Sequence, residues 1–368
     1  MTECNPDSSY LASPEFVTFS FHVITSVTIP VMTFGAYCIL FKTPNKMKSV
    51  KLLMLNLHFW STLSDMTISF FGVPYLRFPT LSGYGLGVIN VPGLLFYCGV
   101  TFILALTASI LAIYENRYYS LFGRHNSWRL VRKPFLAATY ISVPFIFISP
   151  YLNLPEQDSA RRIVLSTLPC LPEFTYSNLK LFVLSLNVTI PFLCILFSCV
   201  FFAISIISFF LLTVYHLVSE QQGTIHSFRT LAIQKNFLIA VTIQTAFTII
   251  IVLAPVLVFI FIVIAWYHNQ KLNNFVCLTL SIHGVGSTIV MDLQIVSTVP
   301  TRSIPFKHCI IQLSVGAVCL NVQCDHLCSS EPMNHWIVIV QNMKILLEVE
   351  AFEQLSVLLQ VNRGTLKV

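Results

Sequence analysis

The sequence predicts an all-α, polytopic membrane protein built as a bundle of seven transmembrane helices. Of its 368 residues, 55% are hydrophobic and only 10% are charged, whereas soluble globular proteins carry about 25% charged residues. Apolar stretches also recur at the length of roughly 20 residues that a helix needs to cross a bilayer core about 30 Å thick. Inside lipid every backbone amide needs an internal partner, so these stretches are expected to be helices rather than strands.

Seven stretches reach this length. They cover about residues 16–41, 52–76, 88–114, 134–152, 181–210, 237–267 and 275–298. The fifth run meets no charged residue before Glu220, so its helix is expected to continue beyond the membrane. Pro191 and Pro255 fall within the fifth and sixth spans, and a proline inside a helix frees a carbonyl and kinks the axis. Both are candidate hinges, although prolines are also simply commoner in membrane helices.

The chain divides into three parts: an extracellular segment 1–15, the seven-helix domain 16–300 and an atypical cytoplasmic tail 301–368. The first part contains no Lys or Arg, and the apolar run after it is longer than the core of a signal peptide. The first span is therefore expected to act as the targeting signal. In the tail, prolines, cysteines and polar residues are mixed with apolar pieces too short to span a bilayer.

Basic residues divide unevenly between the two sides of the predicted bundle. Eleven Lys and Arg residues lie in the first, third and fifth connections, and five lie in the second, fourth and sixth. Because cytoplasmic loops carry the excess of basic residues, the N-terminus is expected outside the cell. The net charge of +6 forms no basic run with interleaved aromatic residues. The charge pattern therefore indicates a protein whose partner is the lipid bilayer, and no nucleic acid is expected to bind.

The segment Glu115-Asn116-Arg117-Tyr118 lies where the third span meets the cytoplasm. An acid two residues before an arginine at a helix end is typical of a switch. Arginine cannot lose its charge, so Arg117 can pair with Glu115 at rest and reach into the bundle or toward a partner protein when active. The plainer alternative is that Arg117 is one more basic residue at the inner face and Glu115 its exposed neighbour.

Two polar residues lie within predicted spans. A carboxylate in mid-membrane is costly unless it is paired, hydrated or neutral, so Asp65 in the second span is a functional candidate. It can act as a polar anchor or as a water or cation site. The alternative is a protonated acid bonded to a neighbouring helix. His283 in the seventh span, nine residues before Asp292, is a weaker candidate.

The cysteines indicate one candidate disulfide and no metal site. Cys98 lies near the outer end of the third span and Cys170 in the second outer loop, so both face an oxidising compartment. The cysteine and histidine spacing in the tail matches no standard zinc site, and neither a metal nor a cofactor is expected. The pattern Asn187-Val188-Thr189 fits an N-glycosylation acceptor, but it falls within the fifth predicted span and is expected to stay unmodified.

The motifs that enzymes require are absent. The sequence contains no HExxH, no glycine-rich phosphate loop and no GxSxG. An enzyme is therefore not expected. A transporter would predict several acid–base pairs within the membrane and two similar halves with broken helices in matching positions. The sequence contains one carboxylate that clearly falls within a span, Asp65, and no internal repeat. A transporter is therefore kept only as an alternative.

Several short segments together carry a family resemblance. They are Leu57-His58-Phe59-Trp60 leading to Asp65, Pro74-Tyr75, Gly83-Tyr84-Gly85-Leu86-Gly87, Glu115 to Tyr119, Leu168-Pro169-Cys170-Leu171-Pro172, Gln234-Lys235, Gln244, and Ser281-Ile282-His283-Gly284 with Ser287-Thr288 and Met291. Over about residues 15–295 the chain resembles the nematode serpentine chemoreceptors of class H (Srh, Str superfamily). The resemblance implies a G-protein-coupled receptor for olfaction. Such a receptor lies in the plasma membrane of a sensory cilium, detects small environmental molecules and signals to a heterotrimeric G protein.

The chain departs from the family pattern after Met291. The family ends its seventh span with a Pro-Tyr-Arg type motif and a short tail. In this chain the sequence from Asp292 to Arg302 lacks that motif, and 66 further residues follow. This departure leaves open how the seventh helix would meet a G protein, and it keeps a non-signalling pseudoreceptor as a second alternative.

Overall fold

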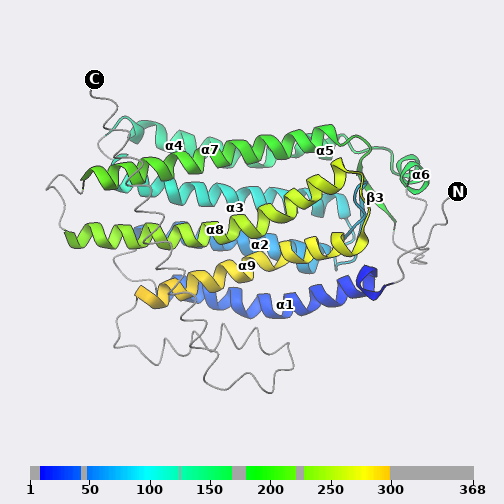
Figure 1. The fold of residues 1–368 in the computed structure, drawn as a ribbon, viewed down its shortest axis with the longest axis horizontal. Helices are drawn as coiled ribbons and strands as arrows, with labels where there is room; N and C mark the ends of the chain where they lie inside the picture. The colour runs from blue at the N-terminus through cyan, green and yellow to red at the C-terminus, as the bar shows by residue number, and fades with distance from the viewer. Residues whose placement is uncertain (1–8, 43–47, 124–125, 168–179, 221–227, 299–368) are drawn as a thin grey trace, which may run out of the picture.

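The computed structural model describes residues 9–42, 48–123, 126–167, 180–220 and 228–298. In this part of the chain, seven long helical segments lie side by side in an elongated bundle (Figure 1). A small β-sheet and a short helix close one end, which we call the sheet end. We call the other end, where α3 ends and α4 begins, the basic end. The predicted tail 301–368 lies outside the described residues.

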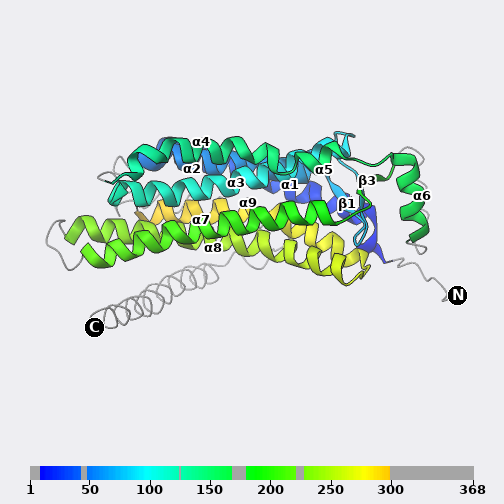
Figure 2. The same cartoon turned by 90° about the horizontal axis from the view of Figure 1, so that it is seen from above.

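The long helices account for most of the described chain. They are α1 (Pro14–Tyr37), which continues into the π-helical turn η2 (Cys38–Lys42), α2 (Lys48–Met66), which continues into the π-helical turn η4 (Thr67–Gly72), α3 (Pro92–Leu121), α4 (Trp128–Ile146) with its short extension α5 (Ile148–Leu152), α7 (Thr189–Glu220), α8 (Phe228–Ile264) and α9 (Gln270–Thr298). A single 3-10 turn, η1 (Tyr10–Ala12), precedes α1, and the short helix α6 (Gln157–Thr167) lies at the sheet end beside the bundle (Figure 2).

Five segments of the described residues are long and apolar enough to cross a membrane. They are Pro14–Phe41, Pro92–Leu121, Trp128–Leu152, Thr189–His216 and Thr245–Ile264. Helices α2 and α9 are not among the five, because each carries a series of buried polar side chains, including Ser61, Ser64 and Asp65 on α2 and Ser281 and His283 on α9. The two helices with the weakest membrane signal are therefore the ones that bring polar groups into the bundle.

Helix α3 occupies the centre of one half of the bundle. It packs against α2, α4 and α7, and almost all of its residues from Ala105 to Tyr118 are buried. Leu111 and Tyr114 of α3 join Phe209 of α7 in the largest apolar cluster. In the other half, α9 packs against α1, α2 and α8. The polar residues of α2 therefore lie between the two halves.

The three-stranded antiparallel sheet was not predicted. Strands β1 (Pro74–Leu76), β2 (Leu81–Gly85) and β3 (Phe182–Ser185) pair in the order β1-β2-β3. The turn η4 ends at Gly72 and is followed by Val73, which has a left-handed φ of 40°. Pro74 cannot continue a helix because it lacks an amide proton. The side chain of Gln157 in α6 covers the outer edge of β3, since it both donates to the carbonyl and accepts from the amide of Val183, each at 3.0 Å.

The sheet explains the main errors in the predicted helix limits. The second span was expected to run to residue 76, but residues 74–76 are strand β1. The fifth was expected to begin at 181, but residues 182–185 pair with β2 and α7 begins only at Thr189. Both segments are short and apolar, so hydropathy alone cannot separate them from a helix end. At the basic end, α3 runs to Leu121 instead of 114, α4 begins at Trp128 instead of 134 and α8 begins at Phe228 instead of 237.

Candidate functional site

Asp65 and His283 form a buried pair in the middle of the bundle. Asp65 lies at the end of α2 and His283 lies on α9, and Nδ1 of the imidazole is 2.9 Å from Oδ1 of the carboxylate. The side chains are 0% and 1% exposed. The same Nδ1 lies 2.8 Å from the carbonyl oxygen of Leu280, so two oxygen atoms lie close to this ring nitrogen. The sequence singled out both residues but not their pairing, and Asp65 was assigned no partner.

The end of α2 beside this pair is irregular and is held by α1. The π-helical turn η4 begins two residues after Asp65, and the Ser69 hydroxyl donates to the Asp65 backbone carbonyl at 2.8 Å. Thr25 of α1 donates to the carbonyl of Ser69 at 3.0 Å. Short π-helical turns within helices are frequent at functional sites. Helices α1, α2 and α9 therefore meet around the Asp65 carboxylate.

A second polar network joins α2, α3 and α4 closer to the basic end. The Asn56 amide donates to the Ser109 hydroxyl at 2.8 Å and to the Tyr140 hydroxyl at 2.6 Å. The indole of Trp60 donates to the side-chain Oδ1 of Asn56 at 3.1 Å. Sequence analysis missed this network, because Asn56, Ser109 and Tyr140 carry no charge and belong to three different spans.

The predicted switch motif lies at the basic end of α3, and all four of its residues are buried. Glu115 is fully buried, and Asn116, Arg117 and Tyr118 are 8%, 6% and 9% exposed. The plainer expectation that Glu115 is an exposed neighbour of Arg117 is therefore wrong. Helix α4 begins one to two turns before its predicted limit, and this added part of α4, together with Phe209 of α7, covers the motif.

The Glu115 carboxylate is held by α4. Its Oε1 accepts a hydrogen bond from the Trp128 indole at 2.8 Å, and its Oε2 accepts one from Nε of Arg132 at 2.9 Å. The same guanidinium donates to the Asn116 side chain at 2.8 Å and lies 4.0 Å from the centre of the Tyr119 ring. We call this set of five residues the α3–α4 clamp. The acid was expected to pair with Arg117 at rest, but both of its oxygens engage α4.

The two α4 residues of the clamp were missed by the sequence analysis, although a signal for them existed. Trp128 and Arg132 are four residues apart, so they lie on one face of a helix. The fourth span was expected to begin only at residue 134, because the basic residues before it are typical of a loop. The helix instead begins at Trp128, and its first turns present this face to α3.

The two candidate hinge prolines lie in different parts of their helices. Pro191 is the third residue of α7, in the first turn, where a proline removes no hydrogen bond because the first amides have no helical partner. Pro191 therefore lies in α7, as expected, but in the first turn, where it frees no helical carbonyl. Pro255 does lie inside α8, and its role as a hinge stays a prediction.

The candidate disulfide remains a prediction. Cys98 has a free thiol about two turns into α3. Its expected partner, Cys170, lies outside the described residues. No cluster of His, Cys, Asp or Glu suited to hold a metal is found in the part of the chain that the structure describes.

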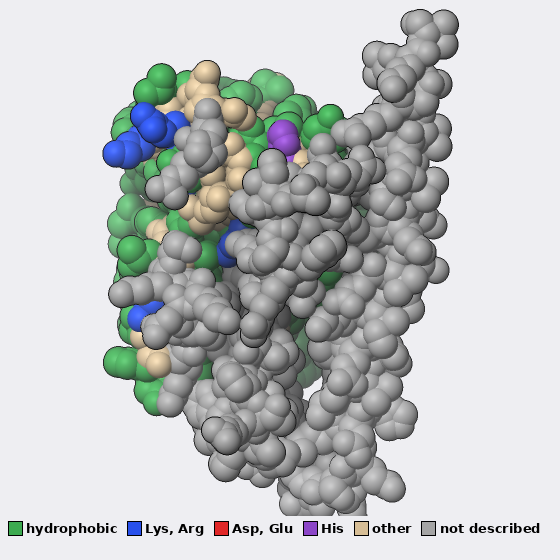
Figure 3. All heavy atoms as spheres, turned by 90° about the vertical axis from the view of Figure 1, so that its left-hand side faces the viewer, with side chains coloured by type: hydrophobic (Ala, Val, Ile, Leu, Met, Phe, Trp, Pro, Cys, Tyr) green, Lys and Arg blue, Asp and Glu red, His purple; other side chains and the backbone are tan. Residues whose placement is uncertain are grey.

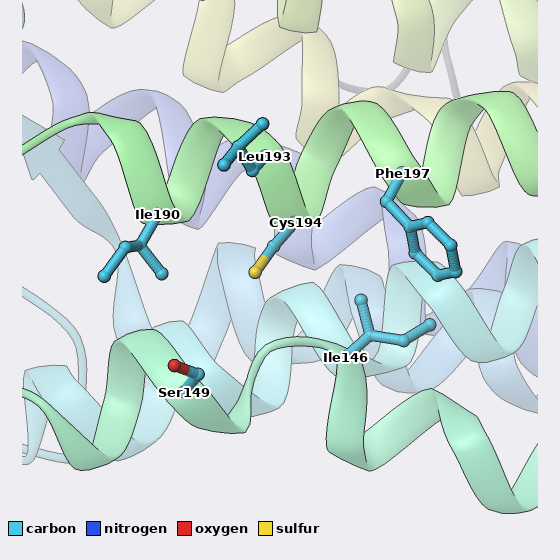
Figure 4. Close-up of a pocket in the computed structure, with 6 residues that line it drawn as sticks. All are labelled: Ile146, Ser149, Ile190, Leu193, Cys194 and Phe197. Atoms are coloured by element: carbon cyan, nitrogen blue, oxygen red, sulfur yellow. The ribbon is translucent and has the colours of Figure 1, made fainter.

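A groove of about 340 Å³ lies between α5 and α7 near the sheet end. Its lining is mostly apolar: Ile146, Ser149, Ile190, Leu193, Cys194 and Phe197 (Figure 4). Two of these residues, Leu193 and Phe197, are more than half exposed, so the groove opens onto the side of the bundle. It lies far from the clamp and shares no residue with the Asp65–His283 pair.

The basic end combines positive charge with apolar surface. Seen from this end, Lys and Arg side chains lie among hydrophobic groups (Figure 3). At the start of α4, Arg129 and Lys133 are exposed, and Leu130 between them is 75% exposed. Basic residues beside exposed apolar residues are typical of a membrane helix end at the boundary between lipid and water.

The arrangement defines a class: a multi-pass helical membrane protein whose buried polar groups connect its helices and whose basic end holds a buried acid–arginine motif. The chain matches the family described as "Serpentine type 7TM GPCR chemoreceptor Srh" over residues 12–295. It is also 29% identical over 301 residues to serpentine receptor class H-72 of Caenorhabditis elegans, with 79% of this chain and 86% of that protein covered.

The chain therefore belongs to the Srh family of serpentine seven-transmembrane chemoreceptors. This confirms the predicted fold class and the family resemblance. It also confirms that the chain is no enzyme, since the family is a receptor family. The match ends at residue 295, close to Met291, after which the sequence departs from the family pattern.

Proposed function

We propose that the chain is a chemosensory receptor of the plasma membrane of a sensory cilium. It detects small environmental molecules and passes the signal to a heterotrimeric G protein. The observation that carries this proposal is the α3–α4 clamp, which holds a buried acid next to a buried arginine at the basic end of the central helix. A switch needs an element with two arrangements that a ligand and a partner can both bias, and α3 crosses the bundle from one end to the other.

The proposed orientation places the sheet end outside the cell and the basic end in the cytoplasm. Eleven Lys and Arg residues lie in the predicted connections at the basic end or in the helix ends beside them, and five lie in those at the sheet end. Basic residues accumulate on the cytoplasmic side. The β-sheet and α6 then form an extracellular cap, while the clamp faces the compartment that contains G proteins.

The orientation is tested with epitope tags. A tag placed before Glu15 is expected to bind antibody on intact cells, because it precedes the first span on the outer side. A tag placed after Arg302 is expected to bind only after permeabilisation. Antibody staining of the two tagged proteins, with a cytosolic protein as the permeabilisation control, measures both. A tail tag that stains on intact cells contradicts the proposed orientation.

The receptor function is tested by measuring ligand-evoked signalling. Cells that express the chain together with a promiscuous G protein are exposed to a panel of volatile and soluble chemicals, and intracellular calcium is recorded. At least one compound is expected to evoke a dose-dependent rise that untransfected cells lack. A correctly inserted chain that responds to none of the panel, and that fails to recruit any G protein when purified, contradicts the proposal.

A non-signalling pseudoreceptor is the second candidate. This alternative is favoured by the sequence after Met291, where the usual end of the seventh span is missing and the family match stops. The two functions differ in a simple property: a pseudoreceptor can bind a ligand and reach the membrane but cannot activate a G protein. A transporter is less favoured, because a single intramembrane acid–histidine pair is found within the described residues, whereas transport is expected to need several.

A further inference from the structure

The pattern Asn187-Val188-Thr189 is the single match to the N-glycosylation motif in the whole sequence. From hydropathy it falls inside the fifth span, where a glycan is impossible. The structure changes this placement, because α7 begins only at Thr189 and Asn187 lies in the connection between β3 and α7. This connection is part of the sheet end, which the proposed orientation places outside the cell.

The local geometry presents the acceptor amide to solvent. Asn187 is exposed, and its Oδ1 accepts a hydrogen bond from the amide of Thr189 at 2.9 Å. This contact forms an Asx-turn, which brings the Asn side chain beside the Thr that the motif requires. Its backbone is fixed by the Ser185 hydroxyl, which donates to the Asn187 carbonyl at 2.7 Å. Within the described residues, Nδ2 of Asn187 makes no hydrogen bond, so the reacting atom is available.

We propose that Asn187 carries an N-linked oligosaccharide in the mature protein. The proposal rests on the orientation in the proposed function. In the reaction, Nδ2 of Asn187 attacks C1 of the first sugar of an oligosaccharide linked to a polyprenyl diphosphate. The N–C1 bond forms, the bond between C1 and the diphosphate oxygen breaks, the lipid diphosphate leaves with the electron pair, and the amide proton passes to a base of the oligosaccharyl transferase.

The length of α7 is compatible with an acceptor beyond the membrane. The helix has 32 residues and is therefore about 48 Å long, whereas the hydrocarbon core is about 30 Å thick. Some 18 Å of helix must lie outside the core or be absorbed by tilt. Asn187 precedes the first residue of this helix, in the connection that joins strand β3 of the sheet end to α7.

A mobility shift tests the proposal. The full-length chain is expressed in animal cells, treated with N-glycosidase or left untreated, and compared on a gel. The wild-type band is expected to shift by one glycan on treatment, and Asn187→Gln is expected to run at the deglycosylated position. Thr189→Ala is expected to lose the glycan, whereas Thr189→Ser is expected to keep it, because either hydroxyl completes the motif. A wild-type protein with no shift overturns the proposal.

A control glycosylation site distinguishes a failure of the proposal for Asn187 from a failure of the proposed orientation. Leu165 on α6 is 49% exposed and is followed by Ser166 and Thr167, so Leu165→Asn creates a new motif in the cap. The substitution is made in the Asn187→Gln background. If this variant is glycosylated and the wild type is not, the orientation holds and the proposal for Asn187 fails. If neither is glycosylated, both the proposal and the proposed orientation fail.

Discussion

Replacing Arg117 by alanine is expected to abolish ligand-evoked G-protein activation while leaving the protein inserted in the membrane. Arg117 lies at the basic end of α3 and is only 6% exposed. Its guanidinium keeps its charge at any physiological pH, so each arrangement of the helix end must supply it with acceptors or water. Insertion is expected to persist, because ten of the eleven basic residues in the predicted connections and helix ends on this side remain. Calcium responses at matched surface expression measure the loss.

Replacing Glu115, the acid of the same motif, by glutamine is expected to raise signalling instead of abolishing it. In Glu115→Gln the side chain loses its charge, so the Arg132 and Trp128 donors of α4 bind it more weakly. Removing one partner of a buried ion pair costs about 3–5 kcal/mol. The cost here is expected to be smaller, because the Arg132 side chain is 23% exposed and can be hydrated. A weaker α3–α4 clamp favours the active arrangement, and basal signalling is expected to rise.

Arg129→Ala is the matched control for both substitutions. Arg129 lies one residue after Trp128 at the start of α4, and its side chain is exposed. Arg129→Ala removes one positive charge from the same end of the bundle, as Arg117→Ala does, and it does not touch the clamp, so its dose–response curve is expected to equal that of the wild type. If Arg117→Ala and Glu115→Gln also give dose–response curves equal to that of the wild type, the motif is only a group of charged residues that sets the topology.

The seven-helix architecture could be predicted because apolar length is a strong signal in a membrane protein. The sheet could not be predicted in the same way. Residues 74–76 and 182–185 are as apolar as the spans beside them, and strand β3 pairs with β2, which lies about one hundred residues earlier in the sequence. Only Pro74 signalled that a helix could not continue there.

The candidate residues could be predicted singly, whereas their partners could not. Asp65 stands out because a carboxylate is rare inside a span, and Glu115 stands out through its motif. The choice of His283 and Arg132 as their partners depends on how α9 packs on α2 and how α4 packs on α3. A local rule favoured Arg117 as the partner of Glu115. On a helix, residues two apart point in different directions, and the acid therefore turns to α4.

Replacing Gly284 by alanine is expected to reduce the amount of folded receptor at the cell surface severalfold. Gly284 follows His283 on α9, and a Cβ at this position would lie 1.8 Å from Oδ2 of Asp65 and 2.7 Å from the methyl carbon of Met32. The carboxylate cannot simply move aside, because its other oxygen is 2.9 Å from His283. Overpacking a core costs about 1–3 kcal/mol, and displacing Asp65 from His283 adds the cost of a broken buried pair.

Gly99→Ala is the control for this substitution. Gly99 lies on α3, and the nearest side-chain atom to a Cβ there would be the Thr67 methyl carbon at 3.9 Å, an ordinary van der Waals distance. The same chemical change is therefore expected to leave surface expression unaltered. Surface and total protein are measured together by labelling intact and permeabilised cells. Equal losses from both alanine variants would show that any added methyl group in a membrane helix harms the protein.

A double substitution identifies the cause of the loss. If the new methyl group acts by colliding with the Asp65 carboxylate, then truncating Asp65 to alanine removes the collision. The protein with both Asp65→Ala and Gly284→Ala is expected to reach the surface as well as Asp65→Ala alone, since residues in contact are not additive in their effects. The alternative outcome is that each substitution lowers surface expression independently, so that the fold-loss of the double variant is the product of the two single fold-losses. That outcome would mean that Gly284 is needed for the packing of α9 and not for the space that the Asp65–His283 pair occupies.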